Sequence, residues 1–237
     1  MQPALSPDIP GAIFVPGAAH CINPLGLSQA LCRHFVEGGG RFVQERVVGL
    51  TMGPEGPTHV LAGGTRYPAD AVVIAAGAYS RQFARDLGAD VPLDTERGYH
   101  VQLPDPGVEV RFPMLFSGRG FAVTPMSGGL RCAGTVELRG LNAPPNYARA
   151  DVILQQAKTL LPGLQDKGVE RWMGHRPSMP DSLPVISPVP GRRNVFYAFG
   201  HGHLGLTLGA VTGSLIADMV SGREPSIDVT PFRADRF

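Results

Sequence analysis

Apolar and polar residues alternate with a helical period in the first sixth of the chain. After Pro24, which suits a first helical turn, an apolar stripe recurs every three or four positions. Its members are Leu25, Leu27, Ala30, Leu31, His34 and Phe35. Three glycines, Gly38–Gly40, then end the pattern. The sequence therefore predicts an amphipathic helix from residue 24 to the glycines.

Short apolar runs on both sides of this helix predict strands. Residues 12–15 (AIFV), 41–50 (RFVQERVVGL) and 58–62 (THVLA) have the length and composition of strands. The segment ADAVVIAAGAYS is almost wholly apolar, which is typical of a strand buried on both faces. Its glycine turn leads into a predicted helix over 80–88. This part of the chain has the mixed order of an α/β domain.

From residue 93 the pattern changes to alternating strands. Four segments, TERGYHVQL, VRFPMLF, GFAVTP and GLRCAGTVEL, are separated by Gly/Pro turns and predict an antiparallel sheet. A helix over about 149–161, a strand (GVERWMGHRP) and a Pro-rich crossing follow. The fold class predicted is therefore α/β (α+β), a partial α/β domain interrupted by an antiparallel sheet. The predicted boundaries are 1–89 and 186–237 for the α/β domain and 90–185 for the insertion.

Composition narrows the class of protein. Hydrophobic residues make up 43% and charged residues 17%, as in an ordinary globular protein, and the formal net charge of +1 gives no reason to expect nucleic acid as a partner. Three scattered cysteines suit neither a disulfide framework nor a zinc ribbon. No apolar run reaches the ~18–20 residues that span a bilayer. The N-terminus lacks the features of a signal peptide. We expect a cytoplasmic protein with no membrane span.

The most informative motif lies near the C-terminus, where an apolar strand, a glycine-rich turn and a long apolar helix follow one another. The turn reads G-x-G-x-x-G, with Gly200, Gly202 and Gly205. Such a turn brings backbone N–H groups to a helix N-terminus, where they stabilise negative charge. A dinucleotide site also needs a further parallel strand with an acidic residue about 20 positions on. Only SGREPSIDVTPFRADRF follows. The turn is thus expected to hold something anionic other than a nucleotide pyrophosphate.

Other polar residues allow more than one interpretation. His201 and His203 could share a metal, but no third ligand is evident, so support of a polar pocket is the better interpretation. Arg176 could be solvated, could pair with Asp181, or could clamp a carboxylate with its planar fork.

Two further stretches could serve either packing or a ligand. Ala76 and Gly77 end the apolar strand and permit close approach of a ligand, although packing alone explains them. The stretch Arg97–His100 could line a pocket, with a solvated strand as the default. No nucleophile constellation is present.

Several stretches together resemble the FAD-dependent D-amino-acid dehydrogenases and oxidases, the superfamily that includes glycine and sarcosine oxidases. They cover about residues 10–225. The stretches are HCINPLGLSQAL with GGGRFVQERVVGL, ADAVVIAAGAYS, RGYHVQL with LRCAGTVEL, and GHRPSMPDSLPVIS with VFYAFGHGHLGLTLGAVTGSLIADMVSG. The last pair is the most specific.

The resemblance implies a function for each candidate. FAD would be the cofactor, and a small amino acid the substrate: a D-amino acid, glycine, an imino acid or an N-methyl amino acid. Arg176 would bind its carboxylate. The cofactor would meet Val47, Ala76 and Gly77, and the turn residues Gly200, His201, Gly202, His203, Leu204 and Gly205. The N–H groups of Gly202 to Gly205 would face the flavin N1/O2 edge, where negative charge develops as hydride arrives.

The sequence departs from the family pattern in two places. The family opens with its own G-x-G-x-x-G βαβ unit, and this sequence begins downstream of it. Some members also use a phenol beside the arginine, whereas Phe121–Thr124 offers no tyrosine. Two interpretations follow: the C-terminal part of an FAD-dependent oxidoreductase, or a non-catalytic remnant or subunit completed by a partner with the nucleotide-binding half. Exposed sheet edges and apolar faces are expected in either case.

Overall fold

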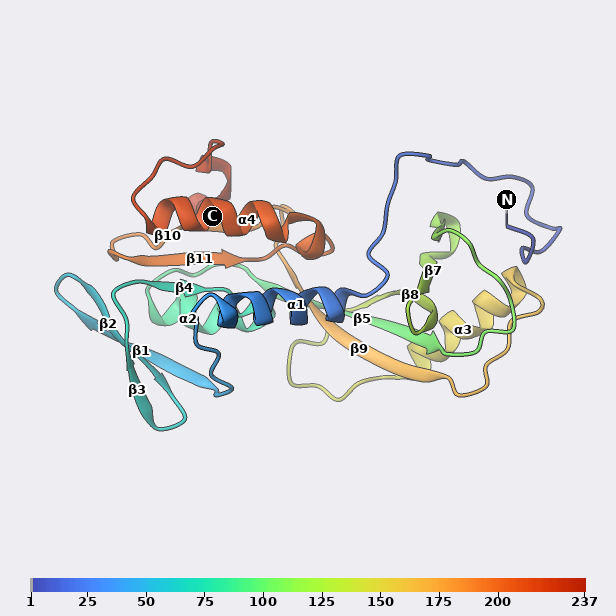
Figure 1. The fold of residues 1–237 in the computed structure, drawn as a ribbon, viewed down its shortest axis with the longest axis horizontal. Helices are drawn as coiled ribbons and strands as arrows, with labels where there is room; N and C mark the ends of the chain where they lie inside the picture. Colours follow the sequence, from blue (N-terminus) through green and yellow to red (C-terminus); the bar gives the residue numbers. More distant parts are fainter. Residues whose placement is uncertain (1) are drawn as a thin grey trace. The chain divides into compact units, whose positions relative to one another are not determined.

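The computed structural model describes residues 2–237, and Figure 1 shows its ribbon. The chain forms two compact units, which are described separately. Unit 1 comprises residues 1–41, 97–138 and 142–174, and unit 2 comprises residues 42–96, 139–141 and 175–237. The predicted division into an α/β domain of 1–89 and 186–237 and an insertion of 90–185 stays a prediction.

The helices are α1 (Pro24–Glu37), α2 (Ser80–Asp86), α3 (Ala148–Leu160) and α4 (Gly205–Val220). The strands are β1 (Val47–Gly53), β2 (Gly56–Ala62), β3 (Thr65–Pro68), β4 (Val72–Ile74), β5 (Asp94–Leu103), β6 (Met114–Phe116), β7 (Phe121–Met126), β8 (Gly129–Glu137), β9 (Glu170–Ser178), β10 (Val185–Pro188) and β11 (Val195–Phe199).

Unit 1 is built on a five-stranded sheet in the order β6-β7-β8-β5-β9. The pairs β6–β7, β7–β8 and β5–β8 are antiparallel, so the predicted antiparallel sheet is confirmed. Helix α3 packs on it through residues spaced three and four apart, which include Ile153, Leu154 and Ala157. Inward-facing residues of alternate strand positions, such as Val101, Val123 and Cys132, complete this core.

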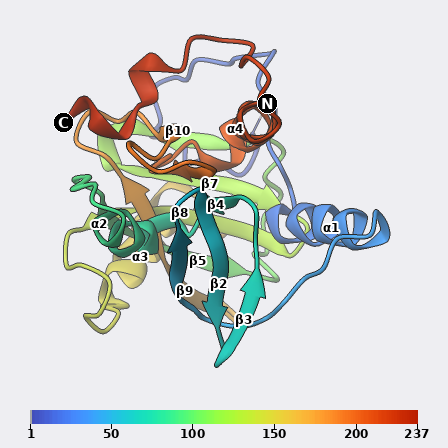
Figure 2. The same cartoon turned by 90° about the vertical axis from the view of Figure 1, so that its left-hand side faces the viewer.

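Unit 2 centres on the mixed sheet β10-β11-β4. Strand β11 runs antiparallel to β10 and parallel to β4. Helix α4 covers one face, where Leu215 and Ile216 pack with Ile186 and Phe196. The core that contains Ile74 of β4 also includes residues of α2. A separate antiparallel sheet, β1-β2-β3, completes the unit, and Figure 2 shows its strands side by side.

Three sequence expectations are wrong in detail. Residues 12–15 form no strand, and residues 41–46 precede β1 as irregular chain. The strand of ADAVVIAAGAYS is short and lies at an edge of its sheet, with Val73 41% exposed, so it is not buried on both faces. Apolar periodicity alone does not reveal whether a neighbouring strand is present to cover that edge.

The predicted helix of residues 24–37 is confirmed, with Pro24 in its first turn and the Asn23 side chain accepting from the Gly26 N–H 2.9 Å away. Its apolar stripe, however, buries no residue within the described chain, and Leu25, Leu31 and Phe35 are exposed. This agrees with the exposed apolar faces expected from the sequence.

Candidate functional site

Two glycine turns lie at the same end of the β10-β11-β4 sheet, where strands β4 and β11 finish. Because β4 and β11 are parallel, with Val72 opposite Val195, their carboxyl ends point the same way. Ala76 and Gly77 follow β4, and Gly200–Gly205 follow β11. In α/β sheets, ligands bind outside the carboxyl ends of the strands. The carboxyl ends of β4 and β11 therefore mark the candidate site.

Backbone geometry explains the glycines that follow these two strands. Gly77, Gly200 and Gly202 have φ values of 56°, 85° and 53°, in the left-handed region that favours glycine. A Cβ on Gly200 would also lie 2.8 Å from Cγ of Met179, whereas one on Gly77 would meet no atom of residues 2–237 within 4 Å. Packing therefore accounts for Gly200, while the space in front of Gly77 is open to a ligand.

The turn uses some of its own N–H groups. The Gly202 N–H donates to the Pro177 carbonyl at 2.7 Å, and the Leu204 N–H to the His201 carbonyl at 2.9 Å. No hydrogen bond of the His203 or Gly205 N–H is recorded within residues 2–237. The expectation that every N–H from Gly202 to Gly205 faces a ligand is thus corrected: the available donors are those of His203 and Gly205, at the positive end of α4.

The two histidines of the turn have different surroundings. His201 Nε2 lies 2.9 Å from Thr212 Oγ1 in the second turn of α4, and burial lowers its pKa. His203 is exposed, and its Nε2 lies 3.2 Å from Glu96 Oε2. Among the residues that the structure describes, no three His, Cys, Asp or Glu side chains gather as a metal site. His201 supports the turn, and His203 extends from it.

Arg176 lies near the end of β9, one residue before Pro177. Burial lowers the pKa of its guanidinium, and the nearby Glu96 carboxylate opposes that shift. The hydrogen bond from Gly202 to Pro177 joins this strand directly to the glycine turn. The structure therefore brings Arg176 together with the turn residues. Val47 begins β1, partly exposed, and no hydrogen bond within residues 2–237 links it to either turn.

Sequence reasoning did not single out Glu96 or His175. Thr95 Oγ1 lies 3.1 Å from His175 Nδ1, and the Tyr79 ring meets the His175 ring edge-on, with centroids 6.2 Å apart. The alternation of side chains along the strand TERGYHVQL could have pointed to Glu96, because it places Thr95 and Glu96 on opposite faces of the strand. Which face meets the turn depends on tertiary structure.

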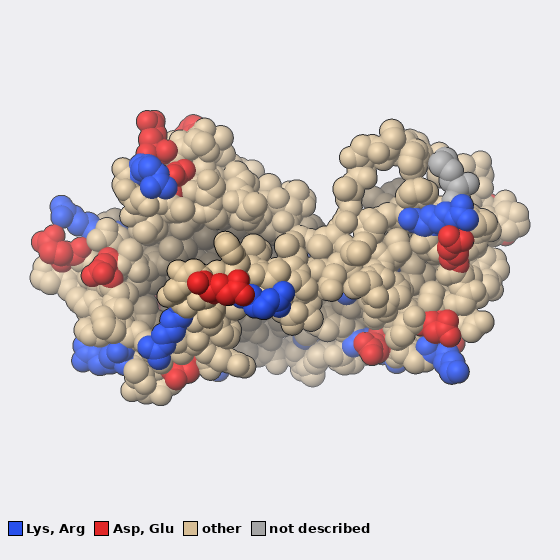
Figure 3. Space-filling view, viewed as in Figure 1, with Lys and Arg blue, Asp and Glu red and all other residues tan. Residues whose placement is uncertain are grey.

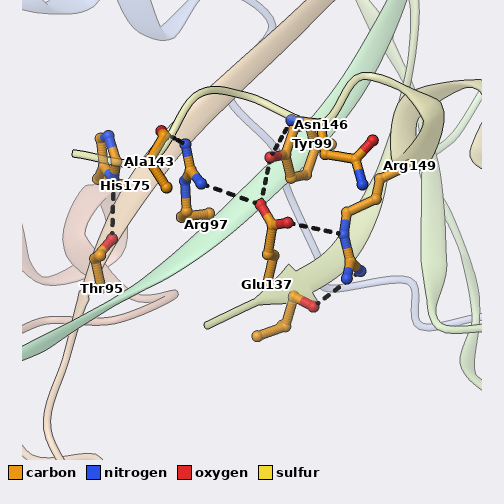
Figure 4. Close-up of polar contacts among 9 residues, drawn as sticks. Thr95, Arg97, Tyr99, Glu137, Ala143, Asn146, Arg149 and His175 are labelled. Atoms are coloured by element: carbon orange, nitrogen blue, oxygen red, sulfur yellow. Dashed lines mark hydrogen bonds and ion pairs between the residues drawn. The ribbon is translucent and has the colours of Figure 1, made fainter. Parts of the chain in front are cut away.

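Arg97 and Tyr99 belong to a buried network and not to a solvated strand (Figure 4). A bulge in β8, with Thr135 at φ 61°, places Glu137 opposite Arg97 and Gly134 opposite Tyr99. The Glu137 carboxylate therefore accepts from Arg97 Nη1 at 3.3 Å and from Tyr99 Oη at 2.5 Å.

The same network reaches the chain after β8. Arg97 Nη2 donates to the Ala143 carbonyl, and Tyr99 Oη accepts from the Asn146 N–H at 3.0 Å. Arg149 Nε lies 3.4 Å from the second Glu137 oxygen. The network fixes the connection between β8 and α3, so these residues have a structural role and do not line a pocket.

Comparison with known proteins places this geometry in a family. The model of the FAD dependent oxidoreductase family matches residues 1–219, more than nine-tenths of the chain. The chain belongs to the FAD-dependent oxidoreductase family. Of the helices in residues 2–237, none has the length and apolarity that crossing a bilayer requires.

Individual family members are similar over almost the whole chain. It is 38% identical to a D-amino-acid oxidase of Bradyrhizobium diazoefficiens, over 100% of the chain and 57% of the relative. It is 31% identical to a glycine oxidase of Pseudomonas putida, over 97% of the chain and 63% of the relative. The crystal structure of glycine oxidase from Geobacillus kaustophilus superposes with a TM-score of 0.77 and 27% identity, over 89% of this chain and 57% of that one. The chain thus spans about three-fifths of these FAD-dependent oxidoreductases.

Proposed function

We propose that this chain carries the substrate-binding and flavin-ring side of an FAD-dependent oxidoreductase that oxidises the C–N bond of a small amino acid. A D-amino acid, glycine or an imino acid is the substrate class we favour. The observation that carries the proposal is the 2.7 Å hydrogen bond between Gly202 and Pro177, which holds the glycine turn against the strand of Arg176. The family match and the D-amino-acid oxidase and glycine oxidase relatives support it.

Each group has a role in this proposal. Arg176 binds the substrate carboxylate through two parallel N–H donors. The open backbone at Ala76 and Gly77, and the His203 and Gly205 donors, fit a flat ligand whose edge becomes negative during the reaction. Bound FAD would supply the hydride acceptor for this oxidation. The role of the protein is to orient the substrate, because amine oxidation by a flavin depends on the orientation of the Cα–H more than on a dedicated base.

The nucleotide half of the cofactor calls for a further segment. The chain spans 57% of the Bradyrhizobium relative, and within residues 2–237 β4 has a partner strand on one side alone. We propose that a βαβ segment pairs with this edge, supplied either by the same polypeptide or by a partner chain.

The exposed apolar residues of helix α4 support the interpretation that the chain is a subunit completed by a partner. Asp218 is its one charged residue and most of its side chains are apolar, yet Leu206 is 53% and Val211 42% exposed. In Figure 3 the surface over this helix is almost wholly tan, the colour of residues without a charge. Large apolar side chains of so apolar a helix are normally buried. A subunit that needs a partner, or a remnant that has lost one, is therefore the second candidate, and cytoplasmic location stays a prediction.

A visible absorption spectrum tests the proposed function first. The purified chain is mixed with excess FAD, desalted and scanned, and then scanned again after anaerobic addition of glycine, D-alanine or D-proline. Retained flavin absorption that bleaches with one amino acid supports the proposal. Retained flavin that none of a full panel of D-amino, imino and N-methyl amino acids bleaches contradicts it. A colourless chain favours the second candidate, which co-purification with the nucleotide-binding half then tests.

A further inference from the structure

Strand alternation places Glu96 and Arg176 on the same face of a strand pair. Strands β5 and β9 are neighbours in their sheet, and Thr95 contacts His175 across them at 3.1 Å. Side chains that meet across two neighbouring strands lie on the same face of the sheet. The next side chain of each strand lies on the opposite face. Glu96 and Arg176, the next residues, therefore share the opposite face.

A second contact shows what this face meets. Glu96 Oε2 lies 3.2 Å from Nε2 of His203, which belongs to the glycine turn after β11. The Gly202–Pro177 hydrogen bond ties the same turn to β9 directly after Arg176. The Glu96 side chain is 31% exposed, so the carboxylate remains accessible. Glu96, Arg176 and the turn thus lie near one another in unit 2.

We propose that Glu96 is a substrate-binding residue that accepts a hydrogen bond from the amino group of the substrate while Arg176 binds its carboxylate. The inference rests on the proposed function and adds a specificity determinant to it. The two protein groups have opposite charges, and so do the two polar groups of an amino acid zwitterion. A zwitterion therefore pairs with both, and its carboxylate and amino group are separated by a single carbon.

This arrangement selects against acids that have no amino group. Such an acid would pair with Arg176 but would have no ammonium group to offset the charge of Glu96, and the two like charges at close range would disfavour binding. The site is expected to reject simple carboxylates by repulsion and to accept amino acids by pairing. Glu96 thus contributes both the attractive and the repulsive part of the specificity.

The test compares matched ligands on matched variants. Flavin-loaded wild type, Glu96→Gln and Glu55→Gln are titrated anaerobically by calorimetry with D-alanine and with propionate, which differ in the amino group. Glycine with acetate serves as a second pair. Glu55 is 85% exposed and paired with Arg193, so its variant makes the same change of charge on the surface of unit 2. Far-UV circular dichroism and the unfolding temperature establish that each variant is folded, and Glu96→Ala serves if Glu96→Gln is not.

We expect Glu96→Gln to raise the Kd of the amino acid by about tenfold to a hundredfold, as for loss of a hydrogen bond to a charged group. The Kd of propionate should fall in the same variant, because the repulsive charge is gone. Glu55→Gln should change neither. Equal Kd values for wild type and Glu96→Gln would overturn the inference while leaving the proposed function intact. If the wild type binds and oxidises no amino acid, the proposed function itself fails.

Discussion

The guanidinium of Arg97 lies 3.3 Å from the carboxylate of Glu137, and both side chains are buried. A buried ion pair contributes little net stability compared with an apolar pair, because both charges lose their hydration. Breaking it is a different matter, since the charge left behind has no counter-ion. Here the Glu137 carboxylate also accepts from Tyr99, whose pKa is raised by burial and then by this hydrogen bond.

Glu137→Ala should lower the free energy of unfolding by about 3–5 kcal/mol, because it strands the buried Arg97 charge. Urea unfolding followed by circular dichroism measures the change. Glu109→Gln is the control, since Glu109 forms an exposed, solvent-screened pair with Arg111 and its loss should leave the free energy of unfolding almost unchanged. A similar small loss for Glu137→Ala would show that the network does not anchor the β8–α3 connection.

Gly200→Ala and Gly209→Ala should have opposite effects on stability. Gly200 combines a φ of 85° with a site where a Cβ would lie 2.8 Å from Met179 Cγ, so alanine should cost about 1–3 kcal/mol. Gly209 lies inside α4 with nothing within 4 Å of its would-be Cβ, so alanine should stabilise by about 0.5–1 kcal/mol. Thermal unfolding of both variants gives the comparison. Equal effects would contradict the assigned turn geometry.

Arg176→Lys should show whether the candidate site needs only the positive charge of residue 176 or also the planar shape of its guanidinium. Lysine keeps the positive charge but cannot donate two parallel hydrogen bonds to a carboxylate. In flavin-loaded protein we expect the amino-acid KM to rise by about tenfold to a hundredfold, with a normal flavin content. Arg171→Lys, on the same strand and paired with Asp151 at the surface, should leave KM unchanged. An unchanged KM in Arg176→Lys would remove Arg176 from the substrate site.

His100 should make stability depend on pH. It stacks on Trp172 with ring centroids 4.8 Å apart, and burial, followed by the charge of Arg131, lowers its pKa from 6.5 to about 4. The unfolded chain thus binds more protons between these values, so the stabilisation is present above pH 6.5 and is lost as the pH falls towards 4. The ring is partly solvated, so we expect a loss of about 1–2 kcal/mol.

The measurement for His100 is the free energy of unfolding at pH 7 and pH 4.5, in wild type and in His100→Gln. Titrating carboxylates affect both proteins alike, so the difference between them isolates the histidine. The difference should shrink as the pH is lowered. A constant difference would show that His100 is accessible to protons in the folded state.

Local patterns in the sequence predicted the elements better than their surroundings. Pro24 and Gly38–Gly40 mark the first helix correctly, because caps and breakers act within one turn. The exposure of Val73 could not be predicted, since it depends on a strand neighbour that periodicity does not encode. The role of Glu137 was hidden for a similar reason: a bulge of one extra residue brings it to both Arg97 and Tyr99.

At the candidate site, too, local features could be predicted and long-range contacts could not. Gly200 and Gly202 were found because left-handed backbone requires glycine, which is a local property. The use of the Gly202 N–H by Pro177 was not foreseen, because the two residues are far apart in the sequence. Glu96 was missed because a single carboxylate in an alternating strand carries no signal until its neighbours are known.

The hydrogen bond from Gly202 to Pro177 has a mechanical consequence. Proline has no N–H, so the carbonyl is the one main-chain group with which residue 177 can hold the turn. A displacement of Arg176 by an arriving carboxylate would then pass along the backbone to the Pro177 carbonyl and through this hydrogen bond to the turn before α4, the helix end that we propose faces the cofactor. Occupancy of the substrate position should accordingly be visible as a shift in flavin colour before any electrons move, which would make the chain its own optical reporter of binding.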